Sequence, residues 1–252
     1  PAAYAQVEAD GKRVVALVAN AGTTAAGLYD PLQEIGVFCR ERNLWFHIDG
    51  AHGGPALLTN KYRSLMRGVE LADSLAMNMH KLMRVTAVCT ALLVRDARTL
   101  DEAFTQEADY LFHDKEQPGY DFLHRTIECT KPVLGLKFLM VLGAMGEAGM
   151  AETIERQFDL TAEVYAYLQS LPDFECPVAP QSNILCFRVK GADDGQLALR
   201  DRLLARGDYY VSSASLNSQR YLRLTLTNPA TSLNEIKGLV GELRELVVAL
   251  RQ

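Results

Sequence analysis

The sequence predicts an α/β fold with a mostly parallel sheet flanked by helices, followed by a smaller α+β unit. Three observations lead to this prediction. Short, continuous apolar runs alternate with helical stretches in the first part of the chain. Polar and small residues follow the end of each run, as they do at the carboxyl edge of a parallel sheet. From about residue 151 the pattern changes to amphipathic helices and strands of alternating polarity.

Four apolar runs in the first part are predicted as buried strands, and they are residues 14–18, 45–49, 73–77 and 88–94. Apolar runs of this length suit strands that are covered on both faces. A helix is expected to begin at Asp30-Pro31, because proline is favoured at the first helical position. Strands separated by helical stretches predict a mostly parallel sheet.

The later elements are predicted from periodicity and from end signals. Residues 108–125 contain Pro118-Gly119 and show no helical period, which predicts a long surface loop. The predicted helices are residues 130–149, 151–171 and 195–206, and the predicted strands are residues 183–189, 209–213 and 221–227. Thr231 is expected to cap a last helix that continues through Leu250.

Two domains are expected from this change of pattern. Residues 1–149 are assigned to the C-terminal part of a large domain that includes a functional loop at about 106–125. Residues 150–252 are assigned to a small α+β domain. The chain starts only one helix before a core strand, and we therefore expect it to be part of something longer.

Composition bounds the function. The chain has 252 residues, of which 48% are hydrophobic and 23% charged, as in globular proteins. A net charge of −5 without a long Lys/Arg run argues against a nucleic-acid or membrane surface. No apolar stretch approaches the ~20 residues that a membrane span needs. The five cysteines have neither zinc-site nor disulfide spacing, which predicts reduced thiols, no metal and a cytoplasmic location.

Polar side chains gather where three predicted strands end, and they are Thr23 and Thr24, Asp49 and His52, and His80 and Lys81. The carboxyl ends of neighbouring parallel strands lie at one edge of a sheet, where ligands bind in open α/β folds. The three clusters are therefore expected to form one site.

Lys81 and Asp49 carry the chemistry expected of that site. A lysine in a partly desolvated site can form a Schiff base, although most lysines are solvated surface groups. Asp49 is flanked by apolar residues, so its carboxylate needs a partner, and a pyridinium nitrogen would be one. A turn aspartate before Gly50 is the alternative interpretation. Together the two side chains indicate a pyridoxal-phosphate (PLP) site.

Three sequence blocks resemble the group II PLP-dependent amino-acid decarboxylases, and they are AGTTAAGLYDPL, HIDGAHGG and ADSLAMNMHKL. The resemblance continues in ADYLF, RTIECTKPVLGLKF and YLRLTLTNPAT, and it looks closest to the glutamate, cysteine-sulfinate and 2,4-diaminobutyrate branch. It implies a PLP-dependent transferase fold of type I, with PLP as the cofactor. It also implies decarboxylation of an L-amino acid to the amine and carbon dioxide, by a cytoplasmic homodimer.

The resemblance implies a role for each matching residue at the cofactor. Lys81 would form the internal aldimine, Asp49 would bind the pyridine nitrogen, and Ala51 would pack on the ring. Thr24 would help to place the ring and its substituents. The cofactor-binding set is therefore Thr24, Asp49, Ala51, Asn78, His80 and Lys81.

Asn78 and His80 would lie near the phosphate or near the lysine. His52, in the small-residue loop after Asp49, is expected to have a supporting role at best, because other family members carry other residues there. His47 alternates with Asp49 on its strand and is interpreted as a core histidine.

Two further residues match positions that act on the substrate. Tyr110 matches a tyrosine on a catalytic loop, which protonates the carbanion (the quinonoid intermediate) after carbon dioxide leaves. Arg223 matches an arginine that holds the substrate α-carboxylate, and a guanidinium fork would fix its orientation. Without the resemblance, Tyr110 would be interpreted as an ordinary loop aromatic and Arg223 as an exposed strand residue.

The chain also departs from the family pattern. Members carry a long segment before the first matching block, with a phosphate-binding loop and a histidine that stacks on the ring, and neither is recognisable here. We therefore expect the missing N-terminal segment to be a partner of this chain. Thr130-Lys131 stand where several relatives have arginines, which leaves the substrate open. The alternatives are another fold-type I activity (transaminase, aldolase or aldehyde synthase) and a non-catalytic chain that completes another subunit.

Overall fold

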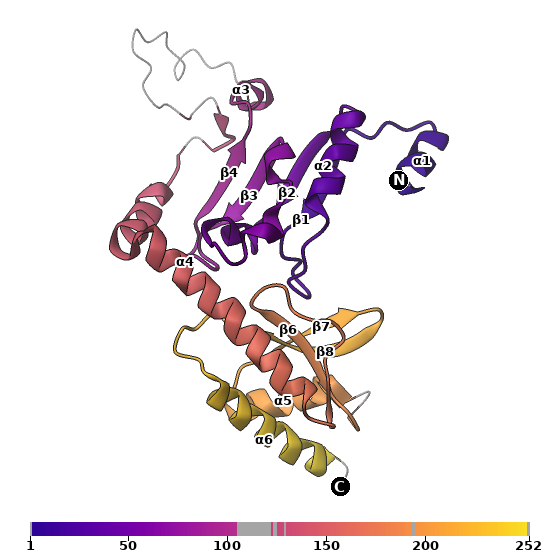
Figure 1. Ribbon diagram of the computed structural model, residues 1–252, viewed down its shortest axis with the longest axis vertical. Helices are drawn as coiled ribbons and strands as arrows, with labels where there is room; N and C mark the ends of the chain where they lie inside the picture. Colours follow the sequence, from indigo (N-terminus) through magenta and orange to yellow (C-terminus); the bar gives the residue numbers. More distant parts are fainter. Residues whose placement is uncertain (1, 105–121, 123–124, 129, 193–194, 251–252) are drawn as a thin grey trace.

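The computed structural model describes residues 2–104, 122, 125–128, 130–192 and 195–250 (Figure 1). Its α-helices are α1 (Ala2–Ala9), α2 (Leu32–Glu41), α3 (Arg98–Phe104), α4 (Leu134–Gln169), α5 (Gln196–Arg206) and α6 (Leu233–Leu250). Its strands are β1 (Ala16–Asn20), β2 (Trp45–Asp49), β3 (Ser74–Asn78), β4 (Thr90–Val94), β5 (Phe174–Glu175), β6 (Ile184–Val189), β7 (Ser212–Leu216) and β8 (Gln219–Thr225). Three short 3₁₀ helices lie between β2 and β3, and they are η1 (Gly54–Leu58), η2 (Arg63–Met66) and η3 (Val69–Leu71).

The first sheet has the order β1-β2-β3-β4, and it confirms the predicted α/β fold. β1, β2 and β3 run parallel, whereas β4 is antiparallel to β3. The sheet is therefore mixed. β4 departs from the parallel pattern because no helix separates it from β3, and a parallel return needs a crossover of a dozen or more residues. The core of this part lies between the sheet and α2, with Phe46, Ile48 and Cys39 almost fully buried.

The second sheet has the order β5-β6-β8-β7 and is antiparallel throughout. This arrangement confirms the predicted α+β unit. Its core is formed by inward-facing residues of β6 and β8 and by apolar residues of α5, α6 and the end of α4. Phe187 and Leu222 are almost fully buried at its centre. The sheet thus presents one packed face to the helices.

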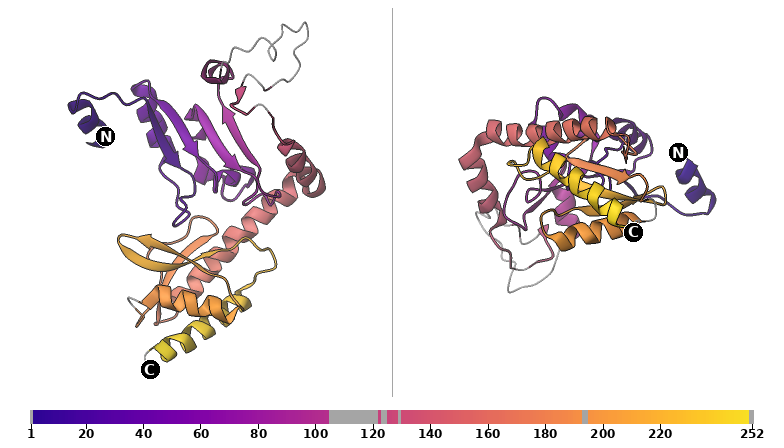
Figure 2. Two further views of the ribbon diagram at one scale, coloured as in Figure 1. Left: turned by 180° about the vertical axis from the view of Figure 1, so that it is seen from behind. Right: turned by 90° about the horizontal axis from the view of Figure 1, so that it is seen from below.

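α4 passes from the first sheet to the second, as both views of the ribbon show (Figures 1 and 2). Two helices were predicted here, and the 36-residue α4 consists of two helical segments that meet at a kink at Gly146. Ile154 packs into the first core, whereas Val164 packs into the second. The domain division after residue 149 stays a prediction, since α4 crosses it.

Two helix starts differ from the sequence prediction by one residue. Pro31 precedes the first residue of α2 instead of occupying it. The last helix begins at Leu233 and is capped by Ser232, whose hydroxyl accepts a hydrogen bond from the Asn234 N–H while its own N–H donates to Glu235. Such a reciprocal arrangement satisfies backbone donors at a helix N-terminus. The prediction of Thr231 as the cap is therefore wrong.

α4 is also long and apolar enough to cross a membrane by length and composition, because an 18-residue window within it has a mean hydropathy of 1.4. Only 6% of that window is buried. One helix of this kind is weak support for a membrane span, since the core helices of other proteins can have the same length and composition. The expectation of no membrane association stays a prediction.

Candidate active site

A cavity of about 570 Å³ lies where the carboxyl end of the first sheet meets the second sheet. Its lining comes from loops after β1, β2 and β3 and from β6, β8 and the residues that follow β8. The lining residues are Thr24, His52, His80, Lys81, Arg84, Val85, Ile184, Arg223, Thr225 and Thr227. Each of the three polar clusters predicted at strand ends therefore contributes to one cavity.

Lys81 lies in a tight turn after β3. Its N–H donates to the Asn78 carbonyl at 3.3 Å, and its own carbonyl accepts from the Arg84 N–H at 3.1 Å. The residue is half-buried. Within the described part of the chain, its ammonium makes no hydrogen bond or ion pair, although an ammonium has three donors. The turn therefore fixes the backbone and leaves the side-chain nitrogen available to a ligand in the cavity.

Asp49 ends β2 and is paired in register with Ala76 of β3. The sequence suggested a buried carboxylate, but the residue is exposed, because the face of β2 that carries it is not covered by the described residues. One carboxylate oxygen accepts a hydrogen bond from the Ala51 N–H at 3.0 Å, as in a turn aspartate. The other oxygen has no hydrogen-bond partner among the described residues. Asp49 does not line the cavity.

Ala51 and Asn78 are brought together by the fold. The Asn78 N–H donates to the Ala51 carbonyl at 3.3 Å, which joins the loop after β2 to the end of β3. The Asn78 side-chain oxygen accepts from the Thr90 hydroxyl at 2.9 Å. Neither residue lines the cavity, so the predicted cofactor-binding set is divided. Half of it, namely Thr24, His80 and Lys81, lines the cavity.

His80 is anchored to the start of β4. Its Nδ1 lies 3.0 Å from the Cys89 nitrogen, whose N–H can only donate. The same Nδ1 lies 2.9 Å from the Cys89 carbonyl oxygen. These contacts with the Cys89 backbone hold the His80 ring in place beside Lys81.

Arg223 lies on β8 and ties the second sheet to the loop after β1. Its Nε donates to the carbonyls of Thr24 and Ala25, both at 3.1 Å, and its Nη1 donates to the hydroxyls of Thr225 at 2.6 Å and Ser212 at 3.3 Å. Burial lowers the pKa of this guanidinium. Arg223 is half-buried, so its interpretation as an exposed strand residue is wrong. Among the described residues nothing accepts from Nη2, which is left for a ligand.

Some lining residues were not found from the sequence. Thr225 follows Arg223 by two residues on β8, which places both side chains on one face of the strand, and Thr227 continues the same spacing just after β8 ends. That signal could have been used. Arg84 has no comparable signal, because its entry into the cavity depends on a left-handed backbone at φ 59° in the turn after Lys81.

Tyr110, the predicted proton donor, lies outside the described residues. The same holds for most of the predicted loop at 106–125. Their roles stay predictions.

A family model described as the pyridoxal-dependent decarboxylase conserved domain matches residues 2–190. The chain belongs to this family. A 2,4-diaminobutyrate decarboxylase of Acinetobacter baumannii is 30% identical over 248 residues, which are 95% of this chain and 48% of that protein. A cysteine sulfinic acid decarboxylase of Mus musculus is 30% identical over 258 residues, with 95% of this chain and 52% of that protein covered.

Solved structures of pyridoxal-dependent decarboxylases agree with the fold. Mouse CSAD in its apo form has a TM-score of 0.87 at 29% identity, and the match covers 98% of this chain and 54% of that one. Rice TDC with PLP and tryptamine has a TM-score of 0.91 at 22% identity, covers 100% of this chain and 54% of that one, and shows the fold alone. The predicted fold type I is confirmed. The chain spans about half the length of the curated relatives it matches.

The cofactor of this family is PLP, which carries an aldehyde, a phosphate and a basic ring nitrogen. The described residues fit these groups. Lys81 offers an unpartnered amine for the aldehyde, and Asp49 offers a carboxylate oxygen without a partner for the ring nitrogen. Among the described residues that line the cavity, Lys81, Arg84 and Arg223 are basic and none is Asp or Glu. A cavity of this charge suits a phosphate and a carboxylate.

Proposed function

We propose that the chain forms the lysine-bearing part of an amino-acid decarboxylase, which converts an L-amino acid to the amine and carbon dioxide. One observation supports this most directly. Lys81 lines the same cavity as Arg223, and its side-chain nitrogen has no hydrogen-bond partner among the described residues. The chain that carries both residues belongs to the pyridoxal-dependent decarboxylases. An amine to hold the cofactor and a cation to hold the substrate are the two groups that the reaction needs first.

PLP, when bound, accepts the electron pair that the departing carboxylate leaves on the α-carbon. Lys81 would hold the cofactor through its side-chain nitrogen. Asp49 would keep a proton on the ring nitrogen by the charge of its carboxylate, and Ala51 would pack against the ring. Thr24 would donate its hydroxyl to a ring substituent.

Arg223 would hold the substrate α-carboxylate through the one guanidinium nitrogen that has no other described partner. Nε and Nη1 are used by backbone carbonyls and hydroxyls, so Nη2 is the group that would donate to the carboxylate. A two-pronged fork would require the guanidinium to give up some of these bonds. We therefore propose a single charge-assisted hydrogen bond from Nη2, which fixes the carboxylate less rigidly than a bidentate pair.

Tyr110 would deliver the proton that replaces the lost carboxylate. A tyrosine hydroxyl near the α-carbon can transfer its proton there and then recover one from water. Loop residues commonly carry such groups because the loop excludes water while the reaction proceeds.

The substrate is proposed to be acidic. When Lys81 holds the cofactor, Arg84 and Arg223 remain as cations among the described lining residues, none of which is Asp or Glu, and this favours a substrate that brings a second negative charge. The complete enzyme is proposed to be a cytoplasmic homodimer. Residues beyond this chain are proposed to supply the phosphate-binding loop and the ring-stacking histidine.

The test is a screen for carbon dioxide and amine across the common amino acids, run on the full-length protein with added PLP. We expect release of carbon dioxide with an equal amount of amine from an acidic amino acid. Carbon dioxide with an aldehyde as the second product would favour the alternative of an aldehyde synthase. That alternative has support of its own, because a 3,4-dihydroxyphenylacetaldehyde synthase of Aedes aegypti is 32% identical over 221 residues, covering 87% of this chain and 42% of that protein. No carbon dioxide from any amino acid would contradict both.

A further inference from the structure

His52 and Asn183 form a buried hydrogen bond that joins the two sheets. His52 follows β2 and Asn183 immediately precedes β6, and the His52 Nε2 lies 2.7 Å from the Asn183 Oδ1. His52 is 9% exposed and Asn183 is fully buried. A short contact between two such polar groups must be a hydrogen bond, because a buried polar atom without a partner is costly.

The contacts of Asn183 decide which atom donates. Its Nδ2 lies 3.2 Å from the Leu226 carbonyl oxygen and 3.4 Å from the Gln157 Oε1, and the carbonyl can only accept. The amide nitrogen therefore faces these oxygens, and the amide oxygen faces the histidine. Since that oxygen accepts, the His52 Nε2 carries the proton, and a neutral His52 ring has its lone pair on Nδ1.

The Nδ1 of His52 is left open to the cavity. It makes no hydrogen bond to the described residues, and it is not one of the fully buried side-chain atoms without a partner, so part of its surface is accessible. The ring itself lines the cavity together with Lys81. The unbonded Nδ1 therefore belongs to a ring that lines the cavity, and we take the cavity as the space that it faces.

The surroundings keep this imidazole neutral. Burial lowers the pKa of His52, the hydrogen bond with Asn183 opposes this, and the positive charges of Lys81 and Arg223 lower the pKa further. In the part of the chain that the structure describes, the other titratable or charged residues of the lining are His80 and Arg84, and none is Asp or Glu. Nothing in the lining therefore favours an imidazolium.

In this structure Lys81 and His52 line one cavity and make no hydrogen bond to each other. We propose that His52 is a positioning residue for Lys81: when the Lys81 side chain turns toward the ring, its nitrogen donates a hydrogen bond to Nδ1, and Asn183 fixes the tautomer that makes this bond possible. A carboxylate acceptor would favour the protonated, positively charged form of the lysine. A neutral imidazole nitrogen can orient the lysine nitrogen without that effect. The inference rests on the proposed function, because the orientation matters only if Lys81 holds the cofactor. The second sheet then sets the geometry of the lysine through a residue that does not line the cavity.

The first test is nitrogen NMR of the protein labelled at its histidines, without added cofactor. We expect His52 at neutral pH to carry its proton on Nε2, and Lys81→Met to shift the Nδ1 resonance of His52 and leave His47 unchanged. A proton on Nδ1, or a Nδ1 resonance that does not respond to Lys81→Met, would overturn the proposal. This result does not depend on whether the protein is a decarboxylase.

The second test uses two variants of His52, each of which keeps a hydrogen-bonding group at the position of only one ring nitrogen. His52→Asn places an amide near the position of Nδ1, and His52→Gln places one near Nε2, where it can still bond to Asn183. Reaction of Lys81 with PLP is measured by borohydride trapping and peptide mass spectrometry. We expect His52→Gln to slow trapping on the order of tenfold, the worth of one lost hydrogen bond, and His52→Asn to slow it much less.

Equal rates for wild type and His52→Gln would overturn the proposal, provided that melting curves show both proteins folded. If either variant fails to fold, the NMR test with native His52 still decides. If Lys81 of the wild type is not trapped at all, the proposed function fails, whereas the NMR result still tests the contact itself.

Discussion

At the scale of single residues, the hydrogen bonds separate side chains that hold the fold from side chains left for a ligand. The Thr23 hydroxyl accepts the Leu28 N–H at 3.1 Å and so serves its own turn. The neighbouring Thr24 hydroxyl has no bond to the described residues and lines the cavity. The sequence placed both threonines at the strand end, and only the family resemblance singled out Thr24 for the cofactor. The difference depends on a backbone turn that the residue types alone do not specify.

Arg223 is expected both to hold the fold and to bind a ligand, and replacing it tests both roles. We expect Arg223→Ala to raise KM on the order of tenfold or more with a smaller effect on kcat, because it removes a charged donor to the substrate. The variant should also unfold more easily, since it loses two hydrogen bonds to the loop after β1 and two within the second sheet. Steady-state kinetics and thermal melts measure these effects. Arg220→Ala, on the exposed start of the same strand, is the matched control. Unchanged KM and kcat would contradict the assignment.

Tyr110 is tested by removing its hydroxyl alone. We expect Tyr110→Phe to keep PLP bound, because the hydroxyl acts after carbon dioxide has left. Amine formation should fall by a factor of about 100 or more, as is usual when a general acid is lost. Product analysis by chromatography would show whether an aldehyde replaces the amine. A normal yield of amine would remove Tyr110 from the mechanism.

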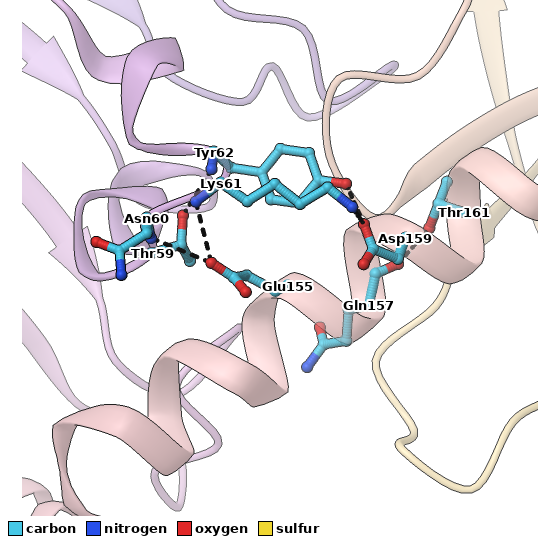
Figure 3. A network of polar contacts seen from close by, with 8 residues as sticks. All are labelled: Thr59, Asn60, Lys61, Tyr62, Glu155, Gln157, Asp159 and Thr161. Carbon is cyan, nitrogen blue, oxygen red and sulfur yellow. Dashed lines mark hydrogen bonds and ion pairs between the residues drawn. The ribbon is translucent and has the colours of Figure 1, made fainter.

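At the scale of elements, α4 is tied to the turn between η1 and η2 by two of its carboxylates (Figure 3). Glu155 accepts the N–H groups of Asn60 and Lys61, both at 3.1 Å. Asp159 accepts the Lys61 ammonium at 2.5 Å and the Tyr62 hydroxyl. These bonds hold α4 against the segment that follows the loop carrying His52.

This network predicts a dependence of stability on acid. Burial raises the pKa of Asp159, but the hydrogen bonds from Lys61 and Tyr62 outweigh it and lower the pKa below its usual value. A carboxylate with a lowered pKa stabilises the folded state above the pKa of the unfolded chain, and this stabilisation is lost as the pH falls below about 4. Asp159 is 46% exposed, so the effect is a fraction of what a buried pair would give.

We therefore expect Asp159→Asn to reduce the free energy of unfolding at neutral pH and to flatten its fall in acid. Urea unfolding measured between neutral and acidic pH tests this. Asp208→Asn, at an exposed carboxylate, is the control and should change neither. An acid limb that is identical in Asp159→Asn and wild type would show that the network does not stabilise the fold.

The break in α4 predicts opposite effects at two of its glycines. Gly146 has φ 67° and ψ 169°, a conformation that side chains rarely adopt, whereas Gly143 has helical geometry and open space around it. We expect Gly146→Ala to destabilise the protein by about 1–3 kcal/mol and Gly143→Ala to stabilise it by about 0.5–1 kcal/mol. Thermal unfolding of both variants decides. A stabilising Gly146→Ala would mean that α4 is straight in solution.

At the scale of the whole molecule, the site exists because two sheets of different type meet. The first sheet brings Lys81 and His52 to its carboxyl edge, and the second brings Arg223 and Asn183 to face them.

The basic residues of the cavity predict that substrate binding depends on salt. We expect KM for an acidic amino acid to rise with ionic strength more steeply than KM for an aromatic one, because salt screens the attraction between cavity and substrate. Carbon dioxide release at several salt concentrations measures this, and equal slopes would contradict an acidic substrate.

The strands and the strand-end clusters could be predicted from the sequence because local pattern determines them. The apolar run at 45–49 is β2 to the residue, and Lys81 lies in the turn that its position after a strand implied. Other features depend on contacts between distant parts of the chain. The reversal of β4 follows from a short connection, and the bond between His52 and Asn183 joins residues 131 positions apart. The length of the connection before β4 could have indicated the reversal, whereas the residues beside His52 and Asn183 give no sign of their bond.

The measurement that tests the account most directly is the site at which PLP becomes attached. The full-length protein is incubated with PLP, reduced with borohydride and digested, and the modified peptide is identified by mass spectrometry. We predict a single modified lysine, Lys81, and loss of both the visible absorption and the modification in Lys81→Ala but not in Lys12→Ala, at an exposed lysine near the chain start. Attachment at other lysines with Lys81 unmodified would contradict the account.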